Sequence, residues 1–156
     1  MVRYDVHMDG ATLVMATKLC IAVVLGIAMG TERSIVAHQQ AGLRTFGLVA
    51  LGACAFVIAG EYIDAQYIGV VNFDPMRIAA GIVQGVGFIG AGLIFMRGES
   101  VHGITTAAGL WVAASVGVLV AFGMYSIAIV ATFLTILIFF GLWYVEQFLK
   151  RLYDTD

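Results

Sequence analysis

Five stretches of this sequence are apolar enough and long enough to cross a lipid bilayer. A helix needs about 20 mostly apolar residues to span the hydrocarbon core. Every backbone N–H and C=O in that core must be satisfied internally, so only helices and closed barrels span it, and the lack of strict alternation favours helices. The stretches cover approximately residues 11–31, 45–63, 75–96, 103–122 and 124–145. We therefore predict an all-α membrane protein, a five-transmembrane-helix bundle forming a single transmembrane domain over residues 1–156.

The composition agrees with a surface that faces lipid. Hydrophobic residues make up 62% of the chain and charged residues only 12%, whereas soluble domains carry about 25% charged residues. The chain has 19 glycines against one proline, and glycine is common where membrane helices touch. A net charge of −2 gives no indication of a nucleic-acid partner.

Basic residues predict the orientation, because Lys and Arg are enriched in cytoplasmic loops. Five of them fall on the side that includes the C-terminus: Arg33, Arg44, Arg97, Lys150 and Arg151. Arg3 and Arg77 fall on the other side. We expect the C-terminus in the cytoplasm and the N-terminus outside. The pattern R-x-x-x-x-H also recurs at an offset of 64 residues, from Arg33 to Arg97, which suggests a parallel internal repeat of spans 1–2 and 3–4.

Residues 85–90, GVGFIG, fit the G-x-G-x-x-G pattern of a dinucleotide-binding loop. Such a loop follows a strand and opens a helix. Here Asp74 and Pro75 are instead typical of an N-cap and a first helical position, which puts these glycines inside a helix. We predict that they pack against another helix, within the chain or between two copies, or alternatively bend the helix to meet a ligand. The set is Gly81, Gly85, Gly87, Gly90 and Gly92.

Several polar side chains are candidates for a ligand or partner site. Gln84 lies deep in the third span, where it either ties helices together or lines a polar cavity. Lys18 faces the bundle or reaches back to the interface, and Arg77 reaches the outer interface or pairs with Asp74. The indole N–H of Trp111 should seek an acceptor. Thr105 and Thr106 begin the fourth span, and together with Gln84 and Arg77 they could line a solute cavity.

The loop ERSIVAHQQAGLRT is the most polar part of the chain. Glu32 and Arg33 end one helix, and Arg44 and Thr45 begin the next. Arginine is a bidentate donor for carboxylate and phosphate, so this set is a candidate site for an anionic group or an acidic partner segment; interfacial anchoring is the alternative. We predict no catalytic residues, no metal site and no cofactor, because the acidic residues fall at span ends, loops or tails and no nucleophile–base set has recognisable spacing.

Three motifs together make the sequence resemble the MgtC/SapB family. They are GTER followed by AGLRT over residues 30–45, DPMRIAAGIVQGVGFIGAGLIF over 74–95, and VHGITTAAGLWVAASVG over 101–117. The resemblance implies a multi-pass protein of the bacterial inner membrane, linked to adaptation to low Mg²⁺ and to virulence through survival inside macrophages. It also implies action through other membrane proteins, including the ATP synthase.

The sequence departs from the family pattern in two places. No soluble C-terminal domain follows the fifth span, which we expect to reflect either a short member or a truncation. His38, Gln39 and Gln40 stand where the family often has a basic residue. Two functional hypotheses remain. The first is a non-enzymatic regulator that binds partner helices; the alternative is a small-solute or ion transporter or channel with a polar cavity between the repeats. With either function we expect a homo-oligomer.

Overall fold

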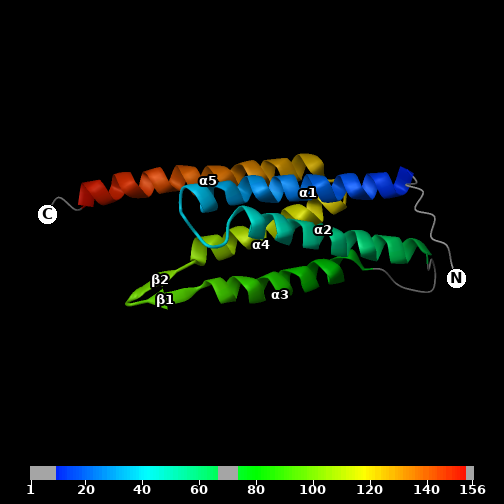
Figure 1. The fold of residues 1–156 in the computed structure, drawn as a ribbon, viewed down its shortest axis with the longest axis horizontal. Helices are drawn as coiled ribbons and strands as arrows, with labels where there is room; N and C mark the ends of the chain where they lie inside the picture. The colour runs from blue at the N-terminus through cyan, green and yellow to red at the C-terminus, as the bar shows by residue number, and fades with distance from the viewer. Residues whose placement is uncertain (1–9, 67–73, 154–156) are drawn as a thin grey trace.

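The computed structural model describes residues 10–66 and 74–153, and its fold is a bundle of long helices (Figure 1). The elements in chain order are α1 (Gly10–Ile35), α2 (Leu43–Gln66), α3 (Pro75–Leu93), β1 (Phe95–Arg97), β2 (Ser100–His102), α4 (Ile104–Ala121) and α5 (Tyr125–Tyr153). Five helices are long and apolar enough to cross a membrane. This confirms the predicted five-helix class.

Successive helices run in opposite directions, so the α1–α2 turn and the β1–β2 hairpin lie at one end of the bundle (Figure 1). Arg33, Arg44 and Arg97 therefore share that end, toward which α5 also runs. Arg77 lies at the other end, and Arg3 lies outside the described residues. The helices alternate in direction, as the count of basic residues at the two ends of the spans assumed. Which end faces the cytoplasm, and whether the chain contains an internal repeat, remain predictions.

Helix α4 lies at the centre and packs against each of the other four helices. Small residues make this possible. A side chain at Gly117 would collide with the backbone carbonyl of Ala50 on α2, and a Cβ at Gly109 would come within 2.5 Å of the Phe139 ring of α5. Dense packing of this kind is what drives helix association in lipid, since apolar burial gains little there. The core of the bundle is therefore built around α4.

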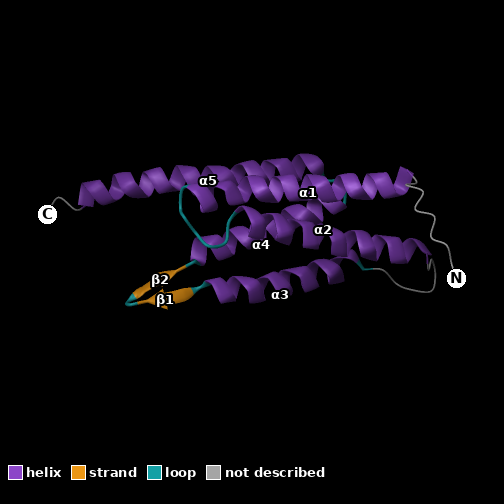
Figure 2. Ribbon diagram, in the orientation of Figure 1, coloured by secondary structure: helices purple, strands orange, loops and turns teal. Residues whose placement is uncertain are grey.

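The third span is shorter than predicted. Helix α3 ends at Leu93, and residues 95–97 form a strand that pairs with residues 100–102 in an antiparallel hairpin (Figure 2). Gly103 allows the chain to return, since its φ of 89° is strained for other residues and a Cβ there would collide with the Leu93 carbonyl oxygen. The expectation that the helix continues to residue 96 was wrong. Ile94 has an extended backbone conformation, which ends the helix and leads the chain into the hairpin.

The other helix ends differ from the predicted spans by a few residues, except for α5. That helix continues to Tyr153, beyond the predicted end at residue 145. Hydropathy marks where the apolar run stops, whereas the hydrogen-bonded helix continues into polar sequence. The start of α3 follows the prediction: Asp74 is the N-cap, its Oδ1 accepts the Met76 N–H at 2.9 Å, and Pro75 occupies the first position.

Candidate functional site

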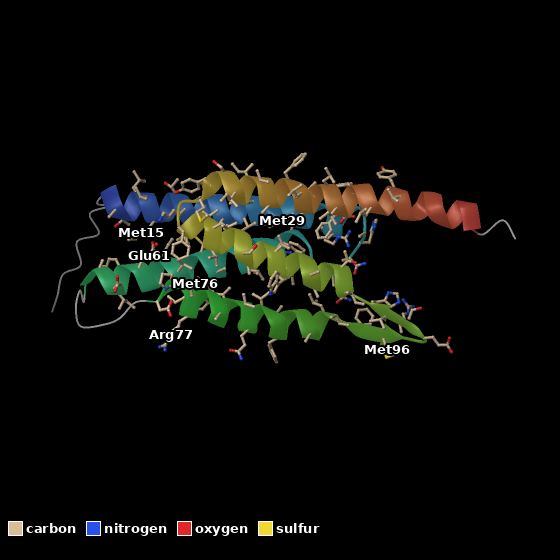
Figure 3. The ribbon with its side chains drawn as sticks, turned by 180° about the vertical axis from the view of Figure 1, so that it is seen from behind. Met15, Met29, Glu61, Met76, Arg77 and Met96 are labelled. Atoms are coloured by element: carbon tan, nitrogen blue, oxygen red, sulfur yellow. The ribbon has the colours of Figure 1, made fainter. Side chains whose placement is uncertain are left out.

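Lys18 faces the bundle. Its Nζ donates to the carbonyl oxygen of Ala121, the last residue of α4, at 2.5 Å, and lies 3.8 Å from Glu61 Oε2 on α2. The last carbonyls of a helix lack intrahelical partners and attract cations. Glu61 lies on α2 at the same end of the bundle as Arg77 (Figure 3). The sequence analysis did not predict a role for Glu61, because it treated this residue only as one of the acids near the ends of the spans. An acidic and a basic residue in two neighbouring spans, Glu61 and Lys18, could have indicated the pair.

Glu32 and Arg33 form a buried ion pair at the opposite end of α1. Glu32 is 1% exposed and Arg33 is 8% exposed, and Arg33 Nε donates to Glu32 Oε2. The Arg33 guanidinium also lies 4.2 Å from the centre of the Phe139 ring, a cation–π contact. The other carboxylate oxygen, Oε1 of Glu32, has no hydrogen-bond partner among the described residues.

Four helices meet at this ion pair. Phe139 of α5 meets Phe46 of α2 edge to face, with ring centres 6.3 Å apart, and Gly109 of α4 leaves room for both rings. Arg33 is turned inward and its Nε is paired with Glu32, so little of its guanidinium is open to an external anion. The structure therefore separates the four residues that the sequence grouped: Glu32 and Arg33 are buried, Arg44 is exposed, and Thr45 is half-buried.

Arg44 and Thr45 lie where two hollows meet. A polar hollow of about 410 Å³ is lined by Ser34, Gln40, Gly42, Leu43, Arg44 and Thr45. An apolar groove of about 950 Å³ runs from the same two residues between α2 and α3. His38 and Gln39 are exposed and do not line either hollow.

The five glycines of α3 do not share one environment. A Cβ at Gly90 would lie 3.5 Å from the Cβ of Ala107, an ordinary contact with α4. Gly81 and Gly85 line the apolar groove. A Cβ at any of Gly81, Gly85, Gly87 and Gly92 would meet nothing within 4 Å. Among the described helices none packs closely against those four positions, and packing between copies or against a partner remains a prediction.

The residues predicted to line a solute cavity are not brought together. Arg77 lies in the first turn of α3, and Thr105 lies in the first turn of the antiparallel α4, close to where α3 ends. The 16 residues from Arg77 to Leu93 correspond to about 24 Å at 1.5 Å per residue, so Arg77 and Thr105 lie near opposite ends of the bundle. Arg77, Gln84 and Thr105 are exposed, whereas Thr106 is buried. Arg77 Nε lies 3.9 Å from Asp74 Oδ2, the pairing foreseen as one alternative, and it points away from the bundle (Figure 3).

Two further predictions concern the partner of Trp111 and the absence of a metal site. Trp111 is half-exposed on α4, and the described part of the chain offers its indole N–H no recorded acceptor. Within residues 10–66 and 74–153, no group of three or more His, Cys, Asp and Glu side chains could hold a metal ion. In the described part of the chain the arrangement is that of a multi-pass helical membrane protein, with a buried ion pair between Glu32 and Arg33 and a groove beside the edge helix α3.

Comparison with known proteins identifies the family. The MgtC family profile matches residues 19–148, and the chain belongs to the MgtC family. It is 46% identical to MgtC of Brucella abortus over 74% of this chain and 47% of the relative. It is 42% identical to MgtC of Salmonella typhimurium over 74% and 46%, and 41% identical to YhiD of Escherichia coli K12 over 78% and 57%. The chain thus spans about half the length of these relatives, and no solved structure matches it.

Proposed function

We propose that this protein is a non-enzymatic regulator of the bacterial inner membrane that serves adaptation to low Mg²⁺. The link to magnesium is supported by membership of the MgtC family and by the name of one relative, "Putative magnesium transporter YhiD". The protein acts by contact between its helices and those of other membrane proteins. By family resemblance the ATP synthase is one such partner, and a second copy of this chain is another.

The observation that carries this proposal is the open surface of α3. Only Val86 and Gly90 are buried along its 19 residues. This helix forms one edge of the bundle (Figure 1), and Phe88, at 83% exposure, stands out from it. In lipid, helices associate through close packing of small residues rather than through apolar burial. A glycine-rich helix at the edge of the bundle suits that kind of contact.

The glycines of α3 also have an energetic cost. Glycine inside a helix is less favourable than alanine by about 0.5–1 kcal/mol. A Cβ at Gly81, Gly85, Gly87 or Gly92 would meet none of the described residues within 4 Å, so no contact with that part of the chain requires glycine at these positions. A partner helix that approaches closely would compensate for that cost, and this favours an intermolecular role for the face that carries Gly87.

The test is growth at low Mg²⁺ in a strain that lacks its own copy of the gene. Gly87→Leu should abolish complementation while the amount of protein in the membrane stays the same. Gly141→Leu is the matched control, because a Cβ there meets only Leu137 Cδ2 at 3.9 Å on α5; it should complement fully. Equal growth with both variants would contradict the proposal. Mg²⁺ uptake into sealed vesicles that contain only this purified protein would instead support transport.

A further inference from the structure

The groove between α2 and α3 has the length of a bilayer and apolar walls. On α2 its lining extends from Arg44 to Ile63, a rise of 19 residues that corresponds to about 28 Å at 1.5 Å per residue. The hydrocarbon core is about 30 Å thick. Leu48 and Phe56 of α2 face Ile82 and Ile89 of α3 across it. Its volume of about 950 Å³ is at the upper end of the range for ligand pockets.

One end of this groove is polar and carries a single positive charge. Arg44 and Thr45 line both the groove and the adjoining polar hollow. Among the described residues that line the two hollows, Arg44 is the only charged one. No ion pair or side-chain hydrogen bond is recorded for Arg44 with the described part of the chain. The hollow therefore offers a cation and a hydroxyl with no competing carboxylate.

The position of this polar end matches the headgroup level of a bilayer. Helix α2 begins at Leu43, so Arg44 and Thr45 lie in its first turn, where the apolar span starts. Basic pockets between helices at the membrane surface bind anionic lipid headgroups. A guanidinium pairs well with phosphate oxygens. An acyl chain continuing from such a headgroup would enter the apolar groove directly.

We propose that an anionic phospholipid binds between α2 and α3, with its phosphate at Arg44 and Thr45 and an acyl chain along the groove. Charge complementarity selects this occupant over a neutral lipid, because the lining contributes one positive charge and no negative one. The site is separate from the Gly87 face, since Gly87 does not line the groove. The lipid test and the growth test can therefore fail independently.

The experiment measures lipid retention by native mass spectrometry on the purified full chain in detergent. Phosphatidylglycerol and phosphatidylcholine with identical acyl chains are added in equal amounts. We expect phosphatidylglycerol to be retained about tenfold better, and Arg44→Gln to remove that preference, which is the effect of losing one hydrogen bond between charged groups. Arg77→Gln is the matched control at the opposite end of the bundle, and it should leave the preference unchanged.

A second pair of variants tests the groove itself. Gly85→Leu places a side chain in the groove, where a Cβ meets nothing within 4 Å, and should lower retention of both lipids severalfold. Gly87→Leu, equally open but outside the groove, should not. Equal retention of the two lipids by the unmodified protein would overturn the proposal. So would competition by glycerol 3-phosphate at the same concentration as the lipid, or a dimer that forms by excluding phosphatidylglycerol.

Discussion

Replacement of Arg33 by methionine should destabilise the bundle far more than its position at a helix end suggests. Arg33 is the hydrogen-bond partner of Glu32, which is 1% exposed. Removal of one member of a buried ion pair leaves an uncompensated charge and costs about 3–5 kcal/mol. Loss of the cation–π contact with Phe139 adds up to about 2 kcal/mol in a desolvated setting. We expect Arg33→Met to lower the free energy of unfolding by at least about 3 kcal/mol.

The assay is a double-mutant cycle for unfolding in mixed micelles. Glu32→Gln combined with Arg33→Met removes both charges, so the double variant should recover most of the stability lost by Arg33→Met alone. Arg97→Met is the control, because Arg97 is exposed on β1 and has no recorded ion pair with the described residues. A loss of less than about 1 kcal/mol for Arg33→Met, or simple additivity of the two substitutions, would show that the ion pair does not stabilise the bundle in this way.

Three further predictions concern other contacts of the bundle, each measured as the free energy of unfolding under the same conditions. Gly117→Ala should destabilise by about 1–3 kcal/mol, because its Cβ collides with a backbone carbonyl. Gly87→Ala, in open space, should be neutral or stabilising by up to about 1 kcal/mol. A greater loss of stability for Gly87→Ala than for Gly117→Ala would contradict the packing described. Lys18→Met should cost about 1–2 kcal/mol, and a silent substitution would mean that the lysine does not bond to α4. Asp74→Ala should cost about 1 kcal/mol through loss of the α3 cap, and Arg77→Ala almost nothing, since that exposed pair is weak.

The helices could be predicted from the sequence because the length of an apolar run is a local property. The start of α3 could be predicted for the same reason, since Asp74 caps the N–H of a residue two positions away and Pro75 fixes its own backbone angle. The hairpin after α3 was missed because Phe95 and Met96 are as apolar as the helix before them, and only Gly98 and Gly103 marked the change.

The partners of the polar residues could not be predicted, because they depend on which face of each helix meets its neighbours. The sequence placed Glu32 and Arg33 at the polar end of a helix, where an external group could reach them, yet both side chains are buried where α1 packs against its neighbours. The glycines behave in the same way. Gly109 and Gly117, which the sequence analysis did not propose as packing positions, make close contacts with α2 and α5, while a Cβ at most of the conspicuous glycines of α3 would meet none of the described residues within 4 Å. Spacing along one helix identifies a face but not what covers it.

We propose above all that the open surface of α3 contacts another protein in the membrane. The direct test is photo-crosslinking in living cells at low Mg²⁺, with a photoreactive phenylalanine analogue at Phe88 of α3 and, as control, at Phe133 of α5, which is also exposed. We predict a crosslink to a second copy or to another membrane protein from position 88, lost on Gly87→Leu, and no protein adduct from position 133. Lipid adducts alone at position 88 would contradict a protein contact on this surface of α3.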